Sequence, residues 1–430
     1  MSGIDGMSGR PGPVAVWTDR IDGLGRHAVA GLAFAVPVST ALANVFLALV
    51  LACWLAGGHY RLKLRCFVDN PVALAALLMF GWLALSLAWA GGFGPDQRDF
   101  LRKYADLLMV AVFMWFLLDP RHRSRALAGF AAAMLLTLAL SYAAAAGLLP
   151  PARWLRAAPG NAVVFKLHIT HSLMMALAAL LFGLFAVEAS NAGRRWLAAA
   201  WGVACVLALV NVLFMVQGRT GYIVLAAFMV LVFTLRAGWR GLAVAAVLVS
   251  FGGVAIYQVS ESMRQRIDLG LHEFSHWDPG TPTAESSSIG RRLEFLTGSL
   301  EMARDRPLIG YGLGSFAAEY ERHVEGTGRE PTSNPHNEAL LLTVQAGIPA
   351  VLLFIHLLAR LAMAARRMPA LHERVLAPAL VLWIGIGGIF NALLIDHTES
   401  LLFALLLGLL AAASVAVPAR GHAGARTPAA

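Results

Sequence analysis

One histidine of the chain, His336, has neighbours that suit acid–base chemistry at a membrane surface. It stands in the run 334–338 (Asn-Pro-His-Asn-Glu), directly before a long apolar segment. Proline is favoured in the first turn of a helix, so we expect His336 to lie at the mouth of a membrane helix. An imidazole in that position can act as a general base near neutral pH. The competing interpretation is a histidine that only caps the helix.

Arg219 lies in a very short turn, 217–221 (Gln-Gly-Arg-Thr-Gly), between two apolar segments. A cation at the start of a helix is disfavoured by the helix dipole, and it is costly near a membrane. An anionic ligand would offset both costs. The alternative is that the side chain reaches the lipid headgroups.

Four more arginines, Arg264, Arg266, Arg291 and Arg292, stand in the longest polar segment of the chain, 258–335. Guanidinium groups bind phosphate oxygens bidentately, so several of them together with Arg219 could hold a pyrophosphate. The run 286–290 (Ser-Ser-Ser-Ile-Gly) before Arg291 could add hydroxyl or amide donors at a helix start. Taken singly, each arginine is more often a solvated surface charge.

The same segment contains the pattern H-E-x-x-H, from His272 to His276, which is the zinc-protease signature. Zinc binding would require a stable helix that places both histidines on one face, and a further ligand. Gly270 precedes the pattern and the run 278–280 (Asp-Pro-Gly) follows it, so we expect barely two helical turns. No clear third ligand follows, and the sequence therefore favours a site without metal.

Two other polar groups lie at expected helix ends. His168 and His171 open one apolar segment, where they are metal ligands, substrate contacts or interfacial histidines. Asp396, His397 and Glu399 form the last turn of the chain, where they either shape the site or solvate a hairpin.

The composition identifies the class of protein. Hydrophobic residues make up 58% of the 430 residues and charged residues only 14%, against about 25% charged in soluble proteins. We predict an all-α, polytopic membrane protein with about twelve transmembrane helices, because apolar runs near twenty residues recur along the chain. The expected segments are 28–40, 41–57, 70–90, 104–118, 126–148, 168–188, 196–216, 219–235, 240–257, 336–359, 375–394 and 399–417.

The short loops alternate in charge. Nineteen of the 34 basic residues lie in the short segments of one side, seven in those of the other, and eight in 258–335. Lys and Arg collect in cytoplasmic loops, so the side with nineteen is predicted to be cytoplasmic and 258–335 periplasmic. The net charge of +9 is explained in the same way, which removes the argument for a nucleic-acid partner.

These predictions divide the chain into five parts: a cytoplasmic tail (1–27), nine membrane helices (28–257), a large periplasmic loop with the active site (258–335), three membrane helices (336–417) and a cytoplasmic tail (418–430). Apolar residues at 293, 296, 300 and 302 recur with helical spacing. We therefore expect two short helices in the loop, near 291–302 and 314–323.

The residues now resemble a known family. Arg291, the run 307–316 (Pro-Leu-Ile-Gly-x-Gly-x-Gly-x-Phe), the Pro-His-Asn-Glu run at 335–338 and Gly347 are similar to the signature region of the O-antigen ligase and O-antigen polymerase superfamily. The resemblance implies a membrane glycosyltransferase of GT-C-like fold. It implies that His336 is catalytic, and that substrate is bound by Arg219, Arg266, Arg291 or the adjacent Arg292, and Asn337. Gly218 departs from the serine usual before the arginine of that turn.

The family transfers a glycan from undecaprenyl pyrophosphate, and the resemblance is strongest to the ligases, whose acceptor is lipid A–core. It implies a metal-independent, inverting transfer in the bacterial inner membrane, with the active site facing the periplasm, no cofactor and lipids as partners. Three alternatives remain open: an O-antigen polymerase, a protein O-oligosaccharyltransferase and, from another class, a transporter. A transporter would place polar groups at the bilayer midplane, whereas here they cluster at one surface.

Overall fold

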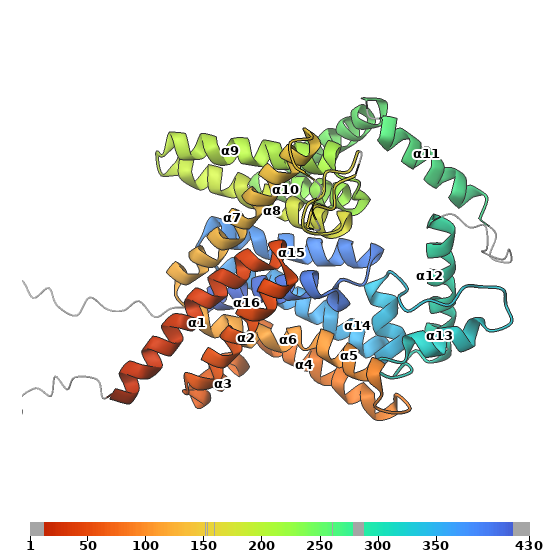
Figure 1. Cartoon of the computed structure of the whole chain (residues 1–430), viewed down its shortest axis with the longest axis horizontal. Coiled ribbons are helices and arrows are strands. Elements are labelled where there is room, and N and C mark those ends of the chain that lie inside the picture. Colours follow the sequence, from red (N-terminus) through yellow and green to blue (C-terminus); the bar gives the residue numbers. More distant parts are fainter. Residues whose placement is uncertain are drawn as a thin grey trace, which may run out of the picture.

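The protein is a bundle of helices, described for residues 13–150, 152, 154–158, 160–259, 261–277 and 288–415 of a computed structural model. Figure 1 shows α11, α12 and α13 to the right of the bundled helices, and α3 with the start of α1 to the left. In chain order the elements are α1 (Pro13–Val38), α2 (Thr40–Ala56), α3 (Tyr60–Asp69), α4 (Pro71–Leu85), η1 (Ser86–Trp89), α5 (Pro95–Tyr104), α6 (Asp106–Phe116), α7 (Pro120–Ala145), α8 (His168–Asn191), α9 (Arg195–Val210), the π-turn η2 (Asn211–Met215), α10 (Arg219–Val259), α11 (Glu261–Ser275), α12 (Ser288–Asp305), α13 (Phe316–Val324), α14 (Glu338–Ala364), η4 (Ala365–Arg367), α15 (Leu371–Phe390), η5 (Leu393–Ile395) and α16 (His397–Ser414).

The polytopic, all-α class is confirmed for the described residues, but the number of spans is not. Eight helices there are long and apolar enough to cross a membrane, or nine if the bent pair α2–α3 counts as one span. Twelve remains a prediction. The expected segment 104–118 became α6, whose 11 residues cover only about 16 Å. The expected segments 219–235 and 240–257 form one element, α10, with a non-helical break at Ala237 and Gly238.

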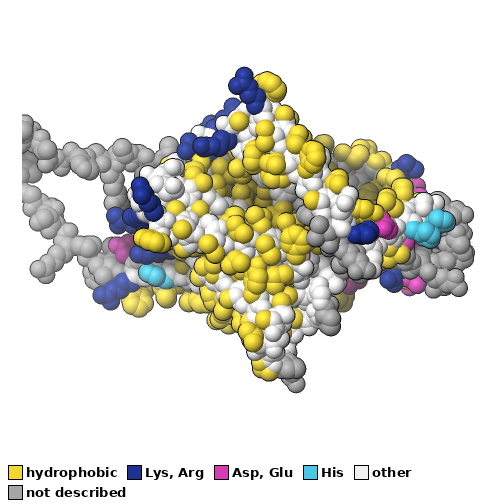
Figure 2. Space-filling model, turned by 90° about the horizontal axis from the view of Figure 1, so that it is seen from above, with side chains coloured by type: hydrophobic (Ala, Val, Ile, Leu, Met, Phe, Trp, Pro, Cys, Tyr) yellow, Lys and Arg dark blue, Asp and Glu magenta, His cyan; other side chains and the backbone are white. Residues whose placement is uncertain are grey.

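Burial separates the central helix from those that face lipid. In its most apolar stretch, α16 is 83% buried, whereas α9 is 22% and α10 is 17% buried. Figure 2 shows hydrophobic side chains across the middle of one face, with the charged side chains mostly outside this band. A helix that is apolar all round belongs either in a core or in a membrane, and the two kinds are both present here.

Polar contacts gather at two opposite ends of the bundle. At one, which we call the His336 end, the starts of α2, α8, α10, α14 and α16 meet. Lys166 there donates to Thr40 at 3.1 Å and to Thr398 at 3.0 Å. At the other, the Arg123 end, the starts of α7 and α15 meet.

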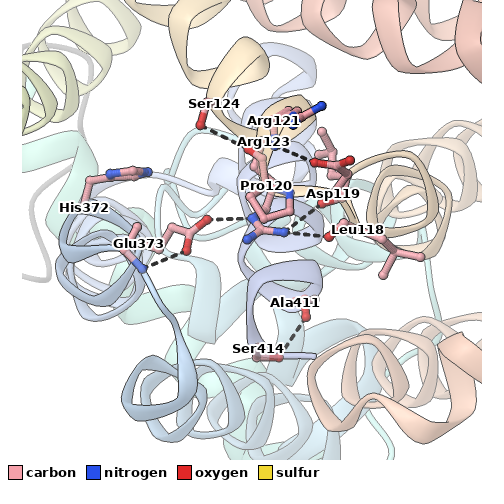
Figure 3. Close-up of polar contacts among 12 residues, drawn as sticks. Leu118, Asp119, Pro120, Arg121, Arg123, Ser124, His372, Glu373, Ala411 and Ser414 are labelled. Atoms are coloured by element: carbon pink, nitrogen blue, oxygen red, sulfur yellow. Dashed lines mark hydrogen bonds and ion pairs between the residues drawn. The ribbon is translucent and has the colours of Figure 1, made fainter. Parts of the chain in front are cut away.

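The Arg123 end is held by a buried ion pair between α7 and α15. Arg123 Nε lies 2.6 Å from Glu373 Oε1, and the two side chains are 2% and 3% exposed. Arg123 also donates to the carbonyls of Leu117 and Leu118 (Figure 3). A buried charge is tolerated only when it is paired and hydrogen-bonded in this way.

A break in α14 is closed by the glycine-rich run. Pro349 has no N–H for the carbonyl of Gln345, and Gly347 is non-helical at φ 76°. The N–H groups of Tyr311 and Gly312 donate hydrogen bonds to the carbonyl oxygens of Val344 and Gln345, at 2.8 and 2.7 Å. Irregular backbone is tolerated at membrane depth only where protein satisfies it like this.

Gly312 must be glycine for two reasons. Its φ is +100°, and an added Cβ would lie 2.3 Å from Cα of Ala90. The close approach wedges the run 310–314 between α14 and the turn after η1, so the motif read from the sequence has a structural role beside the site.

The N-terminal tail and the long polar segment match the predictions only in part. Helix α1 begins at Pro13, so the expected tail 1–27 is partly helical. The helices expected at 291–302 and 314–323 are present as α12 and α13. A further helix, α11, was missed; it contains the first four residues of the H-E-x-x-H pattern, and His276 follows directly after its last residue.

Candidate active site

His336 occupies a tight turn just before α14. The helix begins at Glu338, two residues later than expected, because Asn337 is its N-cap and accepts the N–H of Leu340 at 2.9 Å. His336 has φ +52°, and its N–H is bound by Asn334 Oδ1 at 2.8 Å. A positive φ at a bulky residue is uncommon and marks a position that the surrounding structure enforces.

A chain of hydrogen bonds orients the His336 ring. Nδ1 of His336 lies 3.1 Å from Oδ1 of Asn391, and Nδ2 of Asn391 donates to Asp396 Oδ2 at 3.1 Å. An amide oxygen can only accept, so this contact places the proton on Nδ1 and leaves Nε2 with a free lone pair. The geometry therefore fixes the tautomer that a general base needs.

Asp396 is partly buried and lies near Lys103 and His336. Burial raises the pKa of its carboxyl, while Lys103, His336 and the hydrogen bond from Asn391 oppose that shift. The carboxylate is near enough to both Lys103 and His336 to link them electrostatically. The sequence had placed Asp396 in a possible site turn but gave no role to Asn391.

Asn337 and Glu338 tie α14 to the hinge between α15 and α16. Asn337 Nδ2 donates to the carbonyl of Ile389 at 3.2 Å, and Glu338 Oε2 accepts the N–H of Leu394 at 2.9 Å. The Asn337 side chain thus has partners within the protein at both ends of its amide. Its binding of substrate stays a prediction, and its observed contacts position the turn that carries His336.

Of the arginines predicted to bind substrate, Arg219 and Arg292 lie close to one another. Arg292 on α12 is half-buried, and its pKa is lowered first by burial and then by repulsion from Arg219. The Arg219 and Arg292 guanidinium groups are therefore close enough to repel one another, and such a pair suits an anion. Arg291, the neighbouring residue, is exposed.

Helix α12 also reaches His336 directly. The ring of Phe295, one turn after Arg292, lies 6.3 Å from the ring of His336 at an interplanar angle of 30°. This contact brings the arginine pair and the histidine to the same region.

The two remaining loop arginines lie on α11 or at its start. Arg264 donates to the carbonyls of Tyr257 and Gln258, at 3.4 and 2.6 Å. Arg266 lies within α11, but its side chain is outside the described part, as are residues 278–287, which include Ser286 and Ser287.

The glycine that replaces the expected serine before Arg219 has a packing reason. A Cβ on Gly218 would lie 2.1 Å from Ser172 Oγ and 2.9 Å from the carbonyl oxygen of His168. The turn that presents Arg219 therefore packs directly on the start of α8, and only glycine fits.

With this geometry in view, the comparison with known families is informative. Residues 203–355 match the model of the family described as O-antigen ligase. This stretch resembles an O-antigen ligase domain. It spans α10, the polar segment and the first part of α14, so Arg219, Arg292 and His336 lie inside it, and it supports membership in the O-antigen ligase superfamily. No curated protein matches the chain significantly.

The partners of His336 lie outside the matched O-antigen ligase domain. Asn391 and Asp396 follow residue 355 in the hinge between α15 and α16. The matched stretch therefore includes the histidine and the arginines, whereas the groups that orient the histidine lie outside it.

The H-E-x-x-H pattern does not form a metal site among the described residues. His272 and His276 stack with ring centres 4.1 Å apart on α11, and both are exposed. Across residues 13–277 and 288–415, as far as these are described, no group of three His, Cys, Asp or Glu is arranged to hold a metal ion. The helix ends at Ser275, so only the first histidine of the zinc motif is helical, and a third ligand is not among those residues.

His171 is a structural histidine. It is 2% exposed, and its Nε2 lies 3.0 Å from Oδ1 of Asn211, which in turn donates to Ser141 at 2.7 Å. Asn211 opens the π-turn η2 just before the Arg219 turn. The network ties α7 and α8 to η2, next to the turn that carries Arg219.

Proposed function

We propose that the protein is an O-antigen ligase that transfers O-antigen polysaccharide from undecaprenyl pyrophosphate to a core sugar of lipid A–core. The observation that carries the proposal is the joint position of His336 and the Arg219–Arg292 pair inside the matched domain. One supplies a base with a defined free nitrogen, and the other supplies positive charge for a leaving pyrophosphate.

The reaction is a single displacement. An acceptor hydroxyl gives its proton to Nε2 of His336 as its oxygen forms a bond to the anomeric carbon of the donor sugar. The bond from that carbon to the phosphate oxygen breaks, and undecaprenyl pyrophosphate leaves with the electron pair. Attack opposite to the leaving group inverts the anomeric centre.

The arginines act on the charge of the leaving group. Fixed donors aimed at developing charge stabilise a transition state because they need no reorganisation during the reaction. Arg219 and Arg292 are assigned this role, and Arg292 is preferred to Arg291 because it is the half-buried neighbour of Arg219. Arg266 and Arg291 are assigned a weaker contribution to substrate binding.

We propose the inner membrane as the location and the periplasm as the side of the His336 end. The support is the concentration of basic residues in the loops of the opposite end. A reporter fused between 288 and 330 is expected to report the periplasm, and one fused at Met368 the cytoplasm. Equal signals from both fusions would contradict this topology.

We propose that transfer does not need a divalent metal. Activity is expected to survive EDTA, and the double substitution His272→Ala and His276→Ala is expected to retain most of it, because both rings are exposed on α11. Loss of activity in EDTA that added zinc restores would show that the histidine pair belongs to a metal site.

A cellular assay tests the activity. The protein is produced in a bacterium that makes lipid-linked O-antigen but lacks its own ligase, and lipopolysaccharide is separated on a gel. We expect an O-antigen ladder with the native protein and none with His336→Ala, although that variant reaches the membrane in equal amount. Longer lipid-linked chains without a ladder would instead identify a polymerase, and glycan on protein an O-oligosaccharyltransferase.

A further inference from the structure

A group of charged side chains lies where α12, α13 and the chain that leads to His336 meet, and the proposed reaction does not use it. Glu301 of α12 is at its centre. Its Oε2 accepts a hydrogen bond from Arg329 Nη1 at 2.8 Å and lies 2.9 Å from His323 Nε2, and its Oε1 accepts from Arg329 Nη2 at 3.4 Å. One carboxylate thus joins α12, α13 and the stretch 329–336, which we call the strap.

Glu301 differs from an ordinary surface ion pair. Isolated exposed pairs contribute little, but a bidentate Arg–carboxylate contact within a network is an exception. The Arg329 side chain is only 21% exposed. Hydrogen bonds, first from Arg329 and then from His323, hold the pKa of the Glu301 carboxyl below its usual range, although partial burial opposes them. The carboxylate is therefore charged at neutral pH, as the contact requires.

The strap is a stiff connection from Arg329 to His336. Both of its prolines have a fixed φ. Thr332 Oγ1 donates to the carbonyl of Asn334 at 3.0 Å, and Asn334 Oδ1 accepts the N–H of His336 at 2.8 Å. A shift at Arg329 is therefore passed on to His336 rather than absorbed between them.

The far end of the strap meets α12 again. The ring of Phe295 contacts His336, and it also lies 6.3 Å from the ring of Tyr320 on α13, edge to face. Phe295 and Glu301 are six residues apart, which is about 9 Å along the helix, and Arg292 lies one turn before Phe295. Helix α12 thus contacts both ends of the strap and also carries Arg292.

The backbone of His336 needs support on both sides. Its φ of +52° is a conformation that persists only where the surrounding structure enforces it. On the C-terminal side, Asn337 caps α14. On the N-terminal side, the strap is fixed by the contact of Arg329 with Glu301.

We propose that Glu301 is a positioning residue for glycan transfer. By tying the strap to α12, it sets the position of His336, the base, relative to Arg292, which acts on the leaving pyrophosphate. Glu301 touches neither substrate and acts only through the strap. Its role in transfer rests on the proposed function, whereas the tie itself does not.

Hydrogen–deuterium exchange of the full-length protein in nanodiscs tests the tie without substrate. The amides of Asn334 and His336 are hydrogen-bonded within the strap. We expect Glu301→Ala and Arg329→Ala each to raise their exchange rate several-fold, because local opening becomes easier. Glu319→Ala, which breaks an exposed ion pair within α13, is the matched control and should leave strap exchange native.

The catalytic role is tested by transfer kinetics of the same variants. We expect Glu301→Ala and Arg329→Ala each to lower kcat about tenfold with KM values near the native ones, because a small misplacement of a reacting group lowers the rate without removing a substrate contact. The double variant should fall no further than either single one, since both remove the same tie. Glu319→Ala should have native kinetics.

Two results would overturn the assignment. Native strap exchange in both Glu301→Ala and Arg329→Ala would show that the strap is held elsewhere. Faster strap exchange with native kcat, or with a loss of thermal stability alone, would show that the tie is structural and does not position His336. A native protein that transfers no glycan would instead refute the proposed function and the catalytic role with it, while faster strap exchange in Glu301→Ala would still confirm the tie.

Discussion

Asn391 offers a sharp prediction because its only described side-chain contacts are with His336 and Asp396. Replacing it by alanine removes the acceptor that holds the Nδ1 proton and leaves the ring free to turn or to change tautomer. A neutral hydrogen bond contributes about 0.5–1.5 kcal/mol net. Since about 1.4 kcal/mol is a factor of ten in rate, kcat should fall by roughly two- to tenfold.

The assay is ligation by the purified protein with both lipid substrates varied. We expect kcat to fall in Asn391→Ala while the KM values stay near the native ones, because the hydrogen bonds of the amide go to His336 and Asp396 and orient the base. Thr343→Ala, which removes an exposed hydroxyl from α14, is the control and should have native kinetics.

A second variant separates orientation from simple structural damage. Asn391→Asp places a carboxylate beside Nδ1, which stabilises the protonated ring. The protonated ring cannot act as a base, so the acidic limb of the pH–rate profile should move to higher pH. Native kcat in Asn391→Ala, together with an unmoved profile in Asn391→Asp, would refute the orienting role.

Two further predictions concern charge. Arg219→Lys and Arg292→Lys should each lower kcat by about a hundredfold, because an ammonium cannot bind two phosphate oxygens as a guanidinium does; native turnover in either would remove that residue from the pyrophosphate site. At the opposite end, Arg123→Met should lower the free energy of unfolding by about 3–5 kcal/mol, because Glu373 is left buried without a partner. The double variant Arg123→Met with Glu373→Leu should recover most of the loss in a thermal unfolding assay, and no recovery would mean that the pair is not the cause.

Much of the site could be predicted from local sequence. The apolar spacing in the polar segment gave α12 and α13, and the Pro-His-Asn-Glu run gave the position of His336 at the start of α14 within two residues. Arg219 was singled out as a candidate because a cation between two apolar segments is energetically unfavourable unless an anion or the lipid headgroups offset its cost. These signals are local, so they do not depend on how the helices pack.

Other features depend on packing and could not be read in this way. Asn391 contacts His336 across 55 positions of sequence, and no local pattern marks it. The choice between Arg291 and Arg292 depends on which face of α12 is turned toward Arg219, because adjacent residues on a helix point in different directions. Helix α11 was missed because Gly270 lies within it and weakens the helical signal.

The most direct test of the proposed function is reconstitution with defined substrates. Purified protein in liposomes is supplied with O-antigen linked to undecaprenyl pyrophosphate and with lipid A–core, in the presence of EDTA. We predict that glycan appears on lipid A–core with an inverted anomeric linkage, and that His336→Gln, which can hydrogen-bond but cannot take a proton, lowers turnover at least about a hundredfold. Transfer only to a second lipid-linked glycan or to protein, or native turnover by His336→Gln, would contradict the account.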